Sequence, residues 1–238
     1  MVWGGNMNIG ARLEAIGKLV PQGVSIADIG TDHAYLPAWL AERDVITKAV
    51  AGDIVAGPCA AARSTVAMYG LGNKIEVRMG NGLAIVGTGE VDVIIIAGMG
   101  AGTMIEILEA EPETARRARQ LILQPMAGAP GLRRWAHTNG WRLADEVLVE
   151  EGKHLYEIMV LERGEETEAV DVAYEVGPLL LKQRHPLLPK QLNKLCGHYR
   201  QLLANMQRSA EARQSEKYKS TEKLLQELEG LDDGGHGK

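Results

Sequence analysis

The first 164 residues alternate between short apolar runs and longer stretches with helical spacing, and this alternation constrains the fold more than any other feature. Several of the apolar runs contain almost no polar position, as expected for strands that are covered on both faces. The stretches between them carry helix signals, such as Pro58 near the start and Gly70 at the end of residues 57–70. Strands that alternate with helices predict a parallel, doubly wound α/β sheet. The five expected strands are residues 24–30, 48–54, 74–80, 91–99 and 119–126.

The pattern changes after residue 140, where two strand-like runs follow each other without a helix between them. Residues 141–151 and 154–164 are joined through Gly152 and Lys153, which predicts a hairpin at the end of the sheet. Five β/α units closed by an antiparallel pair are typical of class I methyltransferases, whereas dehydrogenase sheets of the Rossmann type usually end in a sixth parallel strand. A short helix is expected over residues 9–20, where apolar residues recur at steps of three and four.

After about residue 185 the apolar spacing becomes that of paired helices. One such run begins at Leu192 and a second at Tyr218, and the polar stretch 207–217 between them contains neither Pro nor Gly. An antiparallel helical hairpin or one long helix would fit this pattern, and we favour the hairpin. The expected organisation is a methyltransferase-like domain at residues 1–168, a helical coiled-coil domain at 169–230 and a disordered tail at 231–238.

The net charge of −5 is unevenly distributed along the 238 residues. Residues 182–223 carry ten Lys and Arg against three Asp and Glu, whereas residues 1–181 are acidic. A basic segment on an acidic chain is either an anion-binding surface or a solvated helix face. We find no secretory signal and no membrane-length apolar run, and Cys59 and Cys196 match no metal-binding spacing. We therefore expect a cytoplasmic protein with reduced thiols and no bound metal.

The turn after the first expected strand, within residues 27–37, resembles a nucleotide-binding loop but lacks most of the usual glycines. Gly30 is present, whereas Asp32 stands where a second glycine would let the backbone approach a pyrophosphate. A carboxylate at this position repels phosphate and attracts a cation. S-Adenosylmethionine carries a sulfonium and an ammonium group and no phosphate, so Asp28 and Asp32 could face its methionine end.

Polar residues also follow the second and third expected strands. Asp53 could accept hydrogen bonds from both ribose hydroxyls, or it could cap the next helix. Asn81 could contact the adenine edge, or it could belong to a simple Asn-Gly turn. Ligands of such sheets bind beyond the carboxyl ends of the strands, so these residues predict one common site. The expected cofactor-binding residues are Asp28, Gly30, Asp32, Asp53, Ile54, Asn81, Gly82, Ala97 and Gly98.

The fourth expected strand ends in small residues at positions 97–100. Methyltransferases that act on exocyclic amines usually carry a polar-Pro-Pro-aromatic motif at this place. Small residues would let a planar group approach the backbone, and Met99 could lie against a ring. The alternative is a Gly-rich turn into a helix, for which Thr103 and Glu106 predict a capping box.

Five segments follow one another along the chain: ADIGTDHAYLPAWL, AGDI, GNGL, AGMGAGTMIEIL and LILQPM. In this order they resemble the bacterial tRNA (adenine-22-N1) methyltransferases. The resemblance covers about residues 8–164, and VGPLLL and the helical tail also fit. Family members commonly have Asp at the position of Asn81, Gly at that of Ala101 and Asn at that of Met126.

The resemblance implies methyl transfer from S-adenosylmethionine to N1 of adenine 22 in tRNA. N1 has a free lone pair and no proton to lose, so the reaction depends on positioning more than on a strong base. Asp32 is the first catalytic candidate, because a carboxylate would stabilise the cationic product, and His33 is the second. N1 is hidden in a paired base, so we expect the adenine to be flipped out. The expected target-base pocket consists of Met99, Gly100, Gln124, Pro125 and Tyr156.

A tRNA partner needs cations, which the basic segment would supply to its phosphates. We expect a monomer rather than a dimer. The expected RNA contacts are Lys182, Arg184, Lys190, Lys194, Arg200 and Arg208, which Arg116, Arg117, Arg119, Arg133 and Arg134 could extend.

Other functions remain open, because a fold alone does not fix a substrate. A methyltransferase for another RNA, a protein or a small molecule would share the cofactor site, and with a non-RNA substrate it would have no use for the basic tail. A non-catalytic RNA- or partner-binding module on a relic fold would not bind the cofactor. A nicotinamide dehydrogenase is disfavoured by the turn within residues 27–37.

Overall fold

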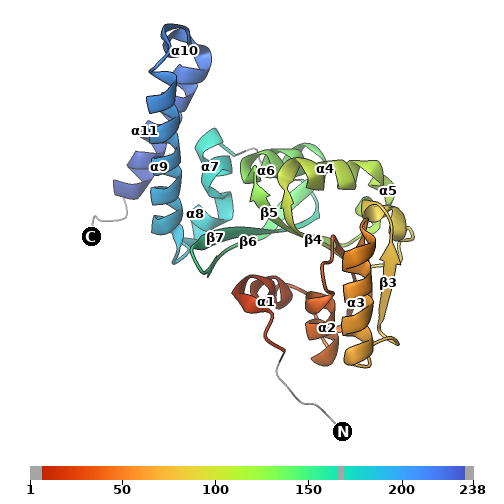
Figure 1. Ribbon diagram of the computed structural model, residues 1–238. Helices are drawn as coiled ribbons and strands as arrows, with labels where there is room; N and C mark the ends of the chain where they lie inside the picture. The colour runs from red at the N-terminus through yellow and green to blue at the C-terminus, as the bar shows by residue number, and fades with distance from the viewer. Residues whose placement is uncertain (1–6, 166–168, 234–238) are drawn as a thin grey trace. The chain divides into compact units, whose positions relative to one another are not determined.

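The computed structural model describes residues 7–165 and 169–233, and the chain divides into two compact units, residues 1–166 and 167–238 (Figure 1). The first unit contains the strands β1 (Val24–Ile29), β2 (Ile46–Asp53), β3 (Ile75–Met79), β4 (Val93–Gly100), β5 (Gln120–Ala127), β6 (Trp141–Glu151) and β7 (His154–Arg163). They form one sheet in the order β3-β2-β1-β4-β5-β7-β6. Strands β1 to β5 are parallel, and β7 pairs antiparallel with both β5 and β6. The predicted sheet and its closing hairpin are confirmed.

Helices cover both faces of this sheet (Figure 1). One face packs against α1 (Gly10–Lys18), α2 (Tyr35–Glu42) and α3 (Ala56–Met68), and the other carries α4 (Ala101–Ala110), α5 (Pro112–Arg117) and α6 (Ala129–Thr138). On the first face, Ile16, Leu40 and Val66 from the helices join Ile26 and Ile95 from the strands in one aliphatic core. A short 3-10 helix, η1 (Gly82–Ile85), follows β3.

The start of α4 differs from the sequence prediction. The helix begins at Ala101, directly after β4, and no side chain caps it. Thr103 therefore lies inside the helix, and the predicted capping box with Glu106 is wrong. The strand runs one residue further than the sequence predicted, to Gly100, so the helix starts without a polar N-cap.

In residues 169–233, the part of the second unit that the structure describes, the only regular elements are helices. They are α7 (Asp171–Val176), α8 (Pro178–Gln183), α9 (Leu188–Met206), α10 (Ala210–Gln214) and α11 (Glu216–Asp233). Leu192 and Cys196 on α9 pack with Leu228 on α11, and Arg200 on α9 pairs with Glu229 on α11. This pairing shows an antiparallel hairpin rather than one long helix. Helix α11 extends into the expected disordered tail, of which residues 234–238 lie outside the described residues.

Two further expectations concern the whole chain. Cys59 and Cys196 are both buried free thiols, as predicted. In residues 7–165 and 169–233, no helix combines the length and the apolar character that a membrane crossing requires.

A buried ion-pair cluster fastens α6 to the closing hairpin of the sheet. The Arg133 guanidinium is fully buried and donates through Nε to Glu146 (2.7 Å) and through Nη2 to Glu157 (2.7 Å). Burial lowers the pKa of Arg133, but the charges of Glu146 and Glu157 outweigh burial, and the net shift is upward. The expectation that Arg133 belongs to an RNA-binding patch is therefore wrong, because this side chain does not reach solvent.

We expect Arg133→Met to destabilise the first unit by about 3–5 kcal/mol, because it leaves two carboxylates buried around an apolar side chain. Urea unfolding followed by tryptophan fluorescence measures the change. Arg117→Met, at an exposed position of α5, is the matched control and should change stability by less than about 0.5 kcal/mol. Equal stability of the two variants would show that the cluster does not hold the hairpin.

Candidate cofactor and active site

A cavity of about 360 Å³ opens at the carboxyl ends of β1, β2, β3 and β4. This volume lies in the usual range for small-molecule sites, about 300–1,000 Å³. The cavity is lined by five of the expected cofactor-binding residues, Gly30, Asp53, Ile54, Asn81 and Gly82. The structure therefore brings the residues that follow three successive strands to one place. Thr103 and Glu106 on α4 also line it, and sequence reasoning missed them because it assigned both to a helix cap.

Gly30 and Met99 shape the wall between β1 and β4. Gly30 has φ +77°, and a Cβ at this position would collide with the Met99 methyl group. Met99 itself lines the cavity. It therefore lies beside the expected cofactor residues, and its role in the base pocket stays a prediction. The irregular register of β4 between Ala97 and Met99, with Gly98 at φ +80°, brings Met99 to this position.

Asp53, the last residue of β2, and Ile54, which follows it, face the cavity. The Asp53 Oδ1 atom accepts a hydrogen bond from the Val55 backbone (2.7 Å), which fixes the carboxylate and leaves Oδ2 able to accept another. Helix α3 starts only at Ala56 and has no side-chain cap, so capping is not the role of Asp53. Ile54 is 64% exposed and offers an apolar surface beside the carboxylate.

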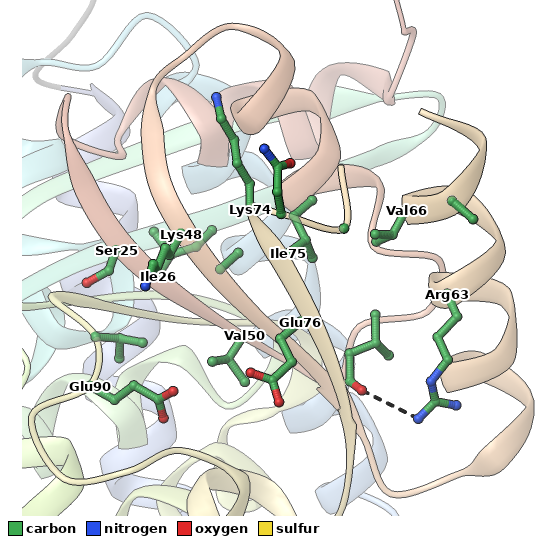
Figure 2. A pocket seen from close by; sticks show the side chains of 16 residues that line it. Ser25, Ile26, Lys48, Val50, Arg63, Val66, Lys74, Ile75, Glu76 and Glu90 are labelled. Atoms are coloured by element: carbon green, nitrogen blue, oxygen red, sulfur yellow. Dashed lines mark hydrogen bonds between the residues drawn. The ribbon is translucent and has the colours of Figure 1, made fainter. Parts of the chain in front are cut away.

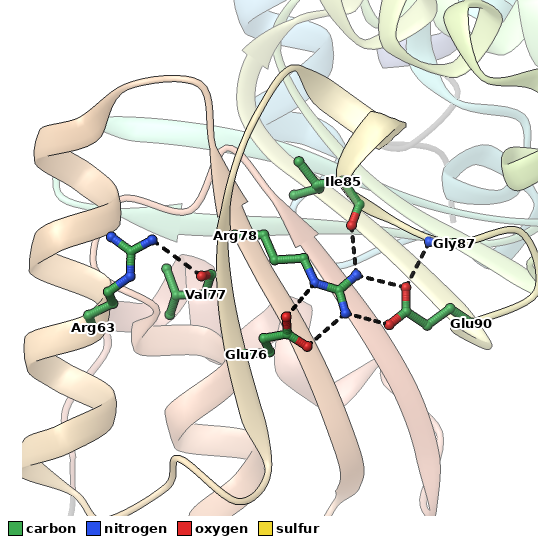
Figure 3. Close-up of polar contacts among 7 residues, drawn as sticks. All are labelled: Arg63, Glu76, Val77, Arg78, Ile85, Gly87 and Glu90. Carbon is green, nitrogen blue, oxygen red and sulfur yellow. Dashed lines mark hydrogen bonds and ion pairs between the residues drawn. The ribbon is translucent and has the colours of Figure 1, made fainter.

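An ion-pair cluster on β3 holds the loop that carries η1 (Figure 3). Arg78 donates to Glu76 on its own strand, to both carboxylate oxygens of Glu90 (2.7 and 2.8 Å) and to the Ile85 carbonyl (2.7 Å). Hydrogen bonds from Arg78 lower the pKa of both Glu76 and Glu90, so the cluster stays charged near neutral pH. This clamp positions the segment from which Asn81 enters the cavity.

A buried carboxylate lies at the end of β1. Asp28 is only 8% exposed, and burial raises its pKa to about 6. A hydrogen bond with the Thr31 side chain and the charge of Arg12 oppose this rise. Near neutral pH the site therefore presents an anion with little water around it, which is the environment that favours a cationic ligand group.

Arg12 on α1 contacts two strands, β5 and β7, and sequence reasoning did not single it out. Its Nη1 atom donates to Gln124 Oε1 on β5 (2.8 Å), and its guanidinium lies over the Tyr156 ring of β7, 5.6 Å from the centroid. Gln124 is fully buried and its Nε2 donates to the Pro125 carbonyl (3.0 Å). Gln124 and Pro125, both expected in the base pocket, are thus part of the buried framework beside Asp28. Tyr156 is half-buried, and Gly100 is half-buried at the end of β4.

The two catalytic candidates lie on the turn after β1. The Asp32 side chain is 80% exposed and the His33 side chain 41%, and His33 Nε2 is 3.4 Å from Asp32 Oδ2. Both groups are therefore accessible to a large substrate at the carboxyl edge of the sheet. Four of the expected cofactor residues, Asp28, Asp32, Ala97 and Gly98, do not line the cavity, in contrast to the neighbouring Gly30.

A second, larger hollow of about 570 Å³ lies against β1, β2, β3 and α3 (Figure 2). Two of its three basic side chains are already engaged: Arg63 donates to the Val77 carbonyl (3.4 Å), and Lys74 donates to the Ala41 carbonyl and to Asp44 (2.6 Å). The predicted site residues do not line it. The smaller cavity at the strand ends is therefore the better candidate site, despite its size.

A parallel sheet with one antiparallel strand, a cavity at the strand ends and an acidic turn after β1 define a Rossmann-like class I methyltransferase. The model of the tRNA (adenine(22)-N(1))-methyltransferase family matches residues 26–230. The chain belongs to this family.

Similar proteins cover almost the whole chain. The tRNA (adenine(22)-N(1))-methyltransferase of Bacillus subtilis is 34% identical over 214 residues, which span 88% of this chain and 90% of that protein. A Streptococcus pneumoniae protein solved in complex with S-adenosyl-L-methionine is 33% identical, with a TM-score of 0.83 over 93% of this chain and 98% of that chain. TrmK of M. capricolum, solved with S-adenosyl-homocysteine, is 25% identical, with a TM-score of 0.80 over 96% and 99%.

We expect Asp28→Asn to stabilise the protein at pH 8. The pKa of Asp28 rises from 3.8 to about 6 on folding, so the folded state binds this proton more tightly than the unfolded state. The stability from this group is present below pH 3.8 and is lost as the pH rises through 6, at a cost of up to about 3 kcal/mol. Denaturant unfolding of both proteins at pH 4 and pH 8 measures the difference, which should grow with pH. A variant less stable than the parent at pH 8 would contradict the burial argument.

Proposed function

We infer that this protein is a tRNA (adenine(22)-N1)-methyltransferase that uses S-adenosylmethionine as the methyl donor. The observation that carries the inference is the cavity at the strand ends, which lies beside a buried carboxylate in a chain of this family. The S-adenosyl-L-methionine complex of the similar Streptococcus pneumoniae protein supports the same cofactor. The expected cytoplasmic location and monomeric state stay predictions.

The residues around the cavity fit the parts of this cofactor. Asp53 Oδ2 would accept from the ribose hydroxyls, and Ile54 would cover one face of the adenine, whose edge Asn81 would contact. The methionine end has an ammonium and a carboxylate group, and the oppositely charged pair of Asp28 and Arg12 would match them. Because S-adenosylmethionine carries no phosphate, the turn that contains Asp32 does not have to bind one.

The chemistry follows from what the exposed residues can do. When bound, S-adenosylmethionine supplies an electrophilic methyl group on a positively charged sulfur. The chain must hold N1 of the adenine in line with this group, since positioning is the main catalytic contribution. Asp32 would stabilise the positive charge that the base acquires, and His33, 3.4 Å away, would keep the carboxylate oriented or hold the base edge.

The second unit offers a surface for the tRNA backbone. All six expected RNA contacts, Lys182, Arg184, Lys190, Lys194, Arg200 and Arg208, are exposed. Lys190 and Lys194 lie one turn apart on α9. Arg200 donates through Nε and Nη2 to Glu229 (3.0 and 2.7 Å), so a phosphate would have to compete with this carboxylate.

Mass spectrometry of tRNA incubated with the protein and isotope-labelled S-adenosylmethionine tests the proposed function. We expect one labelled methyl group on adenine 22, and no label in a tRNA that carries guanine at that position. A methylated small molecule or protein in place of tRNA would support a different methyltransferase. No binding of S-adenosylmethionine in calorimetry would instead indicate a non-catalytic module.

Asp53→Asn should weaken binding of S-adenosylmethionine about 5- to 20-fold, because hydrogen bonds to charged groups contribute about 1.5–3 kcal/mol and Asn retains part of this contact. Titration calorimetry measures the dissociation constant. Asp44→Asn, which removes an exposed carboxylate remote from the cavity, is the control and should leave the affinity unchanged. An unchanged affinity of the Asp53 variant would refute its role in ribose binding.

Charge reversal of Lys190 and Lys194 to Glu should raise the Michaelis constant for tRNA at least tenfold and reduce its dependence on salt. The affinity for S-adenosylmethionine should not change, because the cavity lies in the first unit. Reversal of Lys219 and Lys223 on α11, two exposed lysines that pair with Glu216 and Glu227, controls for net charge. If both double variants behave alike, docking depends on overall charge and not on α9.

A further inference from the structure

A base that has left its helix needs a new stacking partner, and the end of β4 offers none. Residues 97–100 lack the aromatic side chain that would cover an extruded base. The chain contains no Phe, four Trp and six Tyr, so few side chains could replace it. Among the Trp and Tyr residues that the structure describes, only Tyr35 is classed as exposed, at 44%, and the others are buried or half-buried.

Tyr35 does not stand alone at the carboxyl edge of the sheet. Its ring stacks on that of His33, with 4.9 Å between the centroids and 10° between the planes. His33 lies on the turn with Asp32, and Tyr35 is the first residue of α2, a few residues after Gly30, which lines the cavity. The pair is tied to the cavity wall through the same turn, because Gly30 and Gly52 line the cavity and the Thr31 N–H donates to the Gly52 carbonyl.

The backbone between the two rings is held in an unusual conformation. Ala34 has φ +52° and ψ +28°, a left-handed conformation that costs roughly 1–2 kcal/mol for a residue other than glycine. Ala34 is fully buried and its N–H donates to Thr31 Oγ1 (3.1 Å), while the Thr31 N–H donates to the Gly52 carbonyl (2.9 Å). These contacts hold the turn rigidly. Strain of this kind persists where the surrounding structure enforces it and is often found at functional sites.

We propose that the stacked rings of His33 and Tyr35 form a preorganised platform on which the extruded adenine of the tRNA stacks. The proposal rests on the proposed function. A rigid aromatic surface binds a base at low entropic cost, and stacking of a base on an aromatic side chain contributes a measurable share of affinity. Asp32, 3.4 Å from His33, lies at the edge of the platform, where its carboxylate meets the positive charge that the methylated ring acquires.

Two substitutions at Tyr35 test the platform in the full-length protein. Tyr35→Leu keeps an apolar side chain but removes the ring, and it should raise the Michaelis constant for tRNA about 5- to 100-fold. Tyr35→Phe keeps the ring and should stay within about twofold of the parent. The dissociation constant for S-adenosylmethionine should be the same in all three proteins, which separates loss of stacking from damage to the cofactor site.

Fluorescence supplies a readout that a merely structural role of Tyr35 would not change. A tRNA with 2-aminopurine at position 22 should be dim in complex with the parent and with Tyr35→Phe, because the probe stacks on the rings. It should be several-fold brighter with Tyr35→Leu. Met68→Ala, at the exposed C-terminal end of α3, is the control and should behave as the parent protein does.

The outcomes separate the platform from the proposed function. Methylation by the parent, together with an unchanged Michaelis constant and unchanged quenching in Tyr35→Leu, would overturn the platform alone. A parent protein that binds S-adenosylmethionine but leaves adenine 22 unmethylated would overturn both.

Discussion

A carboxylate kept out of water at the end of β1 is the constraint on which the site depends. Burial of Asp28 opposes its ionisation, and only Thr31 and the charge of Arg12 offset part of this effect. A buried ionised carboxylate lowers the stability of a folded protein unless a cationic group of a ligand pairs with it, and such groups are often found at functional sites. Under the proposed function, Asp28 would lower the stability of the free protein and favour binding of a cationic methyl donor, and the helix that carries Arg12 would belong to the site.

Charged side chains also hold the parts of the sheet that carry the functional groups. Arg78 ties the loop after β3 to the start of β4 through Glu90, and Arg133 ties α6 to the closing hairpin. Arg12 bridges α1 to Gln124, so β5 and β7 converge on the same point. An aliphatic core without Phe gives the sheet its stability, while these pairs fix the geometry of its carboxyl edge.

The strands and the cofactor turn could be predicted because their signals are local. Continuous apolar runs identify buried strands, and Asp53 and Asn81 follow such runs directly. Arg12, Arg133 and Tyr35 could not be assigned in the same way. The partners of Arg12 and Arg133 lie on other strands, 112 residues away in the case of Gln124, and no local pattern indicates them. The capping box at Thr103 was wrong because β4 continues through Gly100 and α4 begins directly after it, and a glycine gives no strand signal in the sequence.

The most direct measurement compares two ligands of opposite character at pH 8, where Asp28 is ionised. Calorimetric titrations with S-adenosylmethionine and with a nicotinamide dinucleotide would be run under the same conditions. We predict saturable 1:1 binding of S-adenosylmethionine and no detectable heat from the dinucleotide, because its diphosphate would meet the Asp28 and Asp32 carboxylates. Comparable affinity for the dinucleotide, with its diphosphate beside Gly30, would contradict the account.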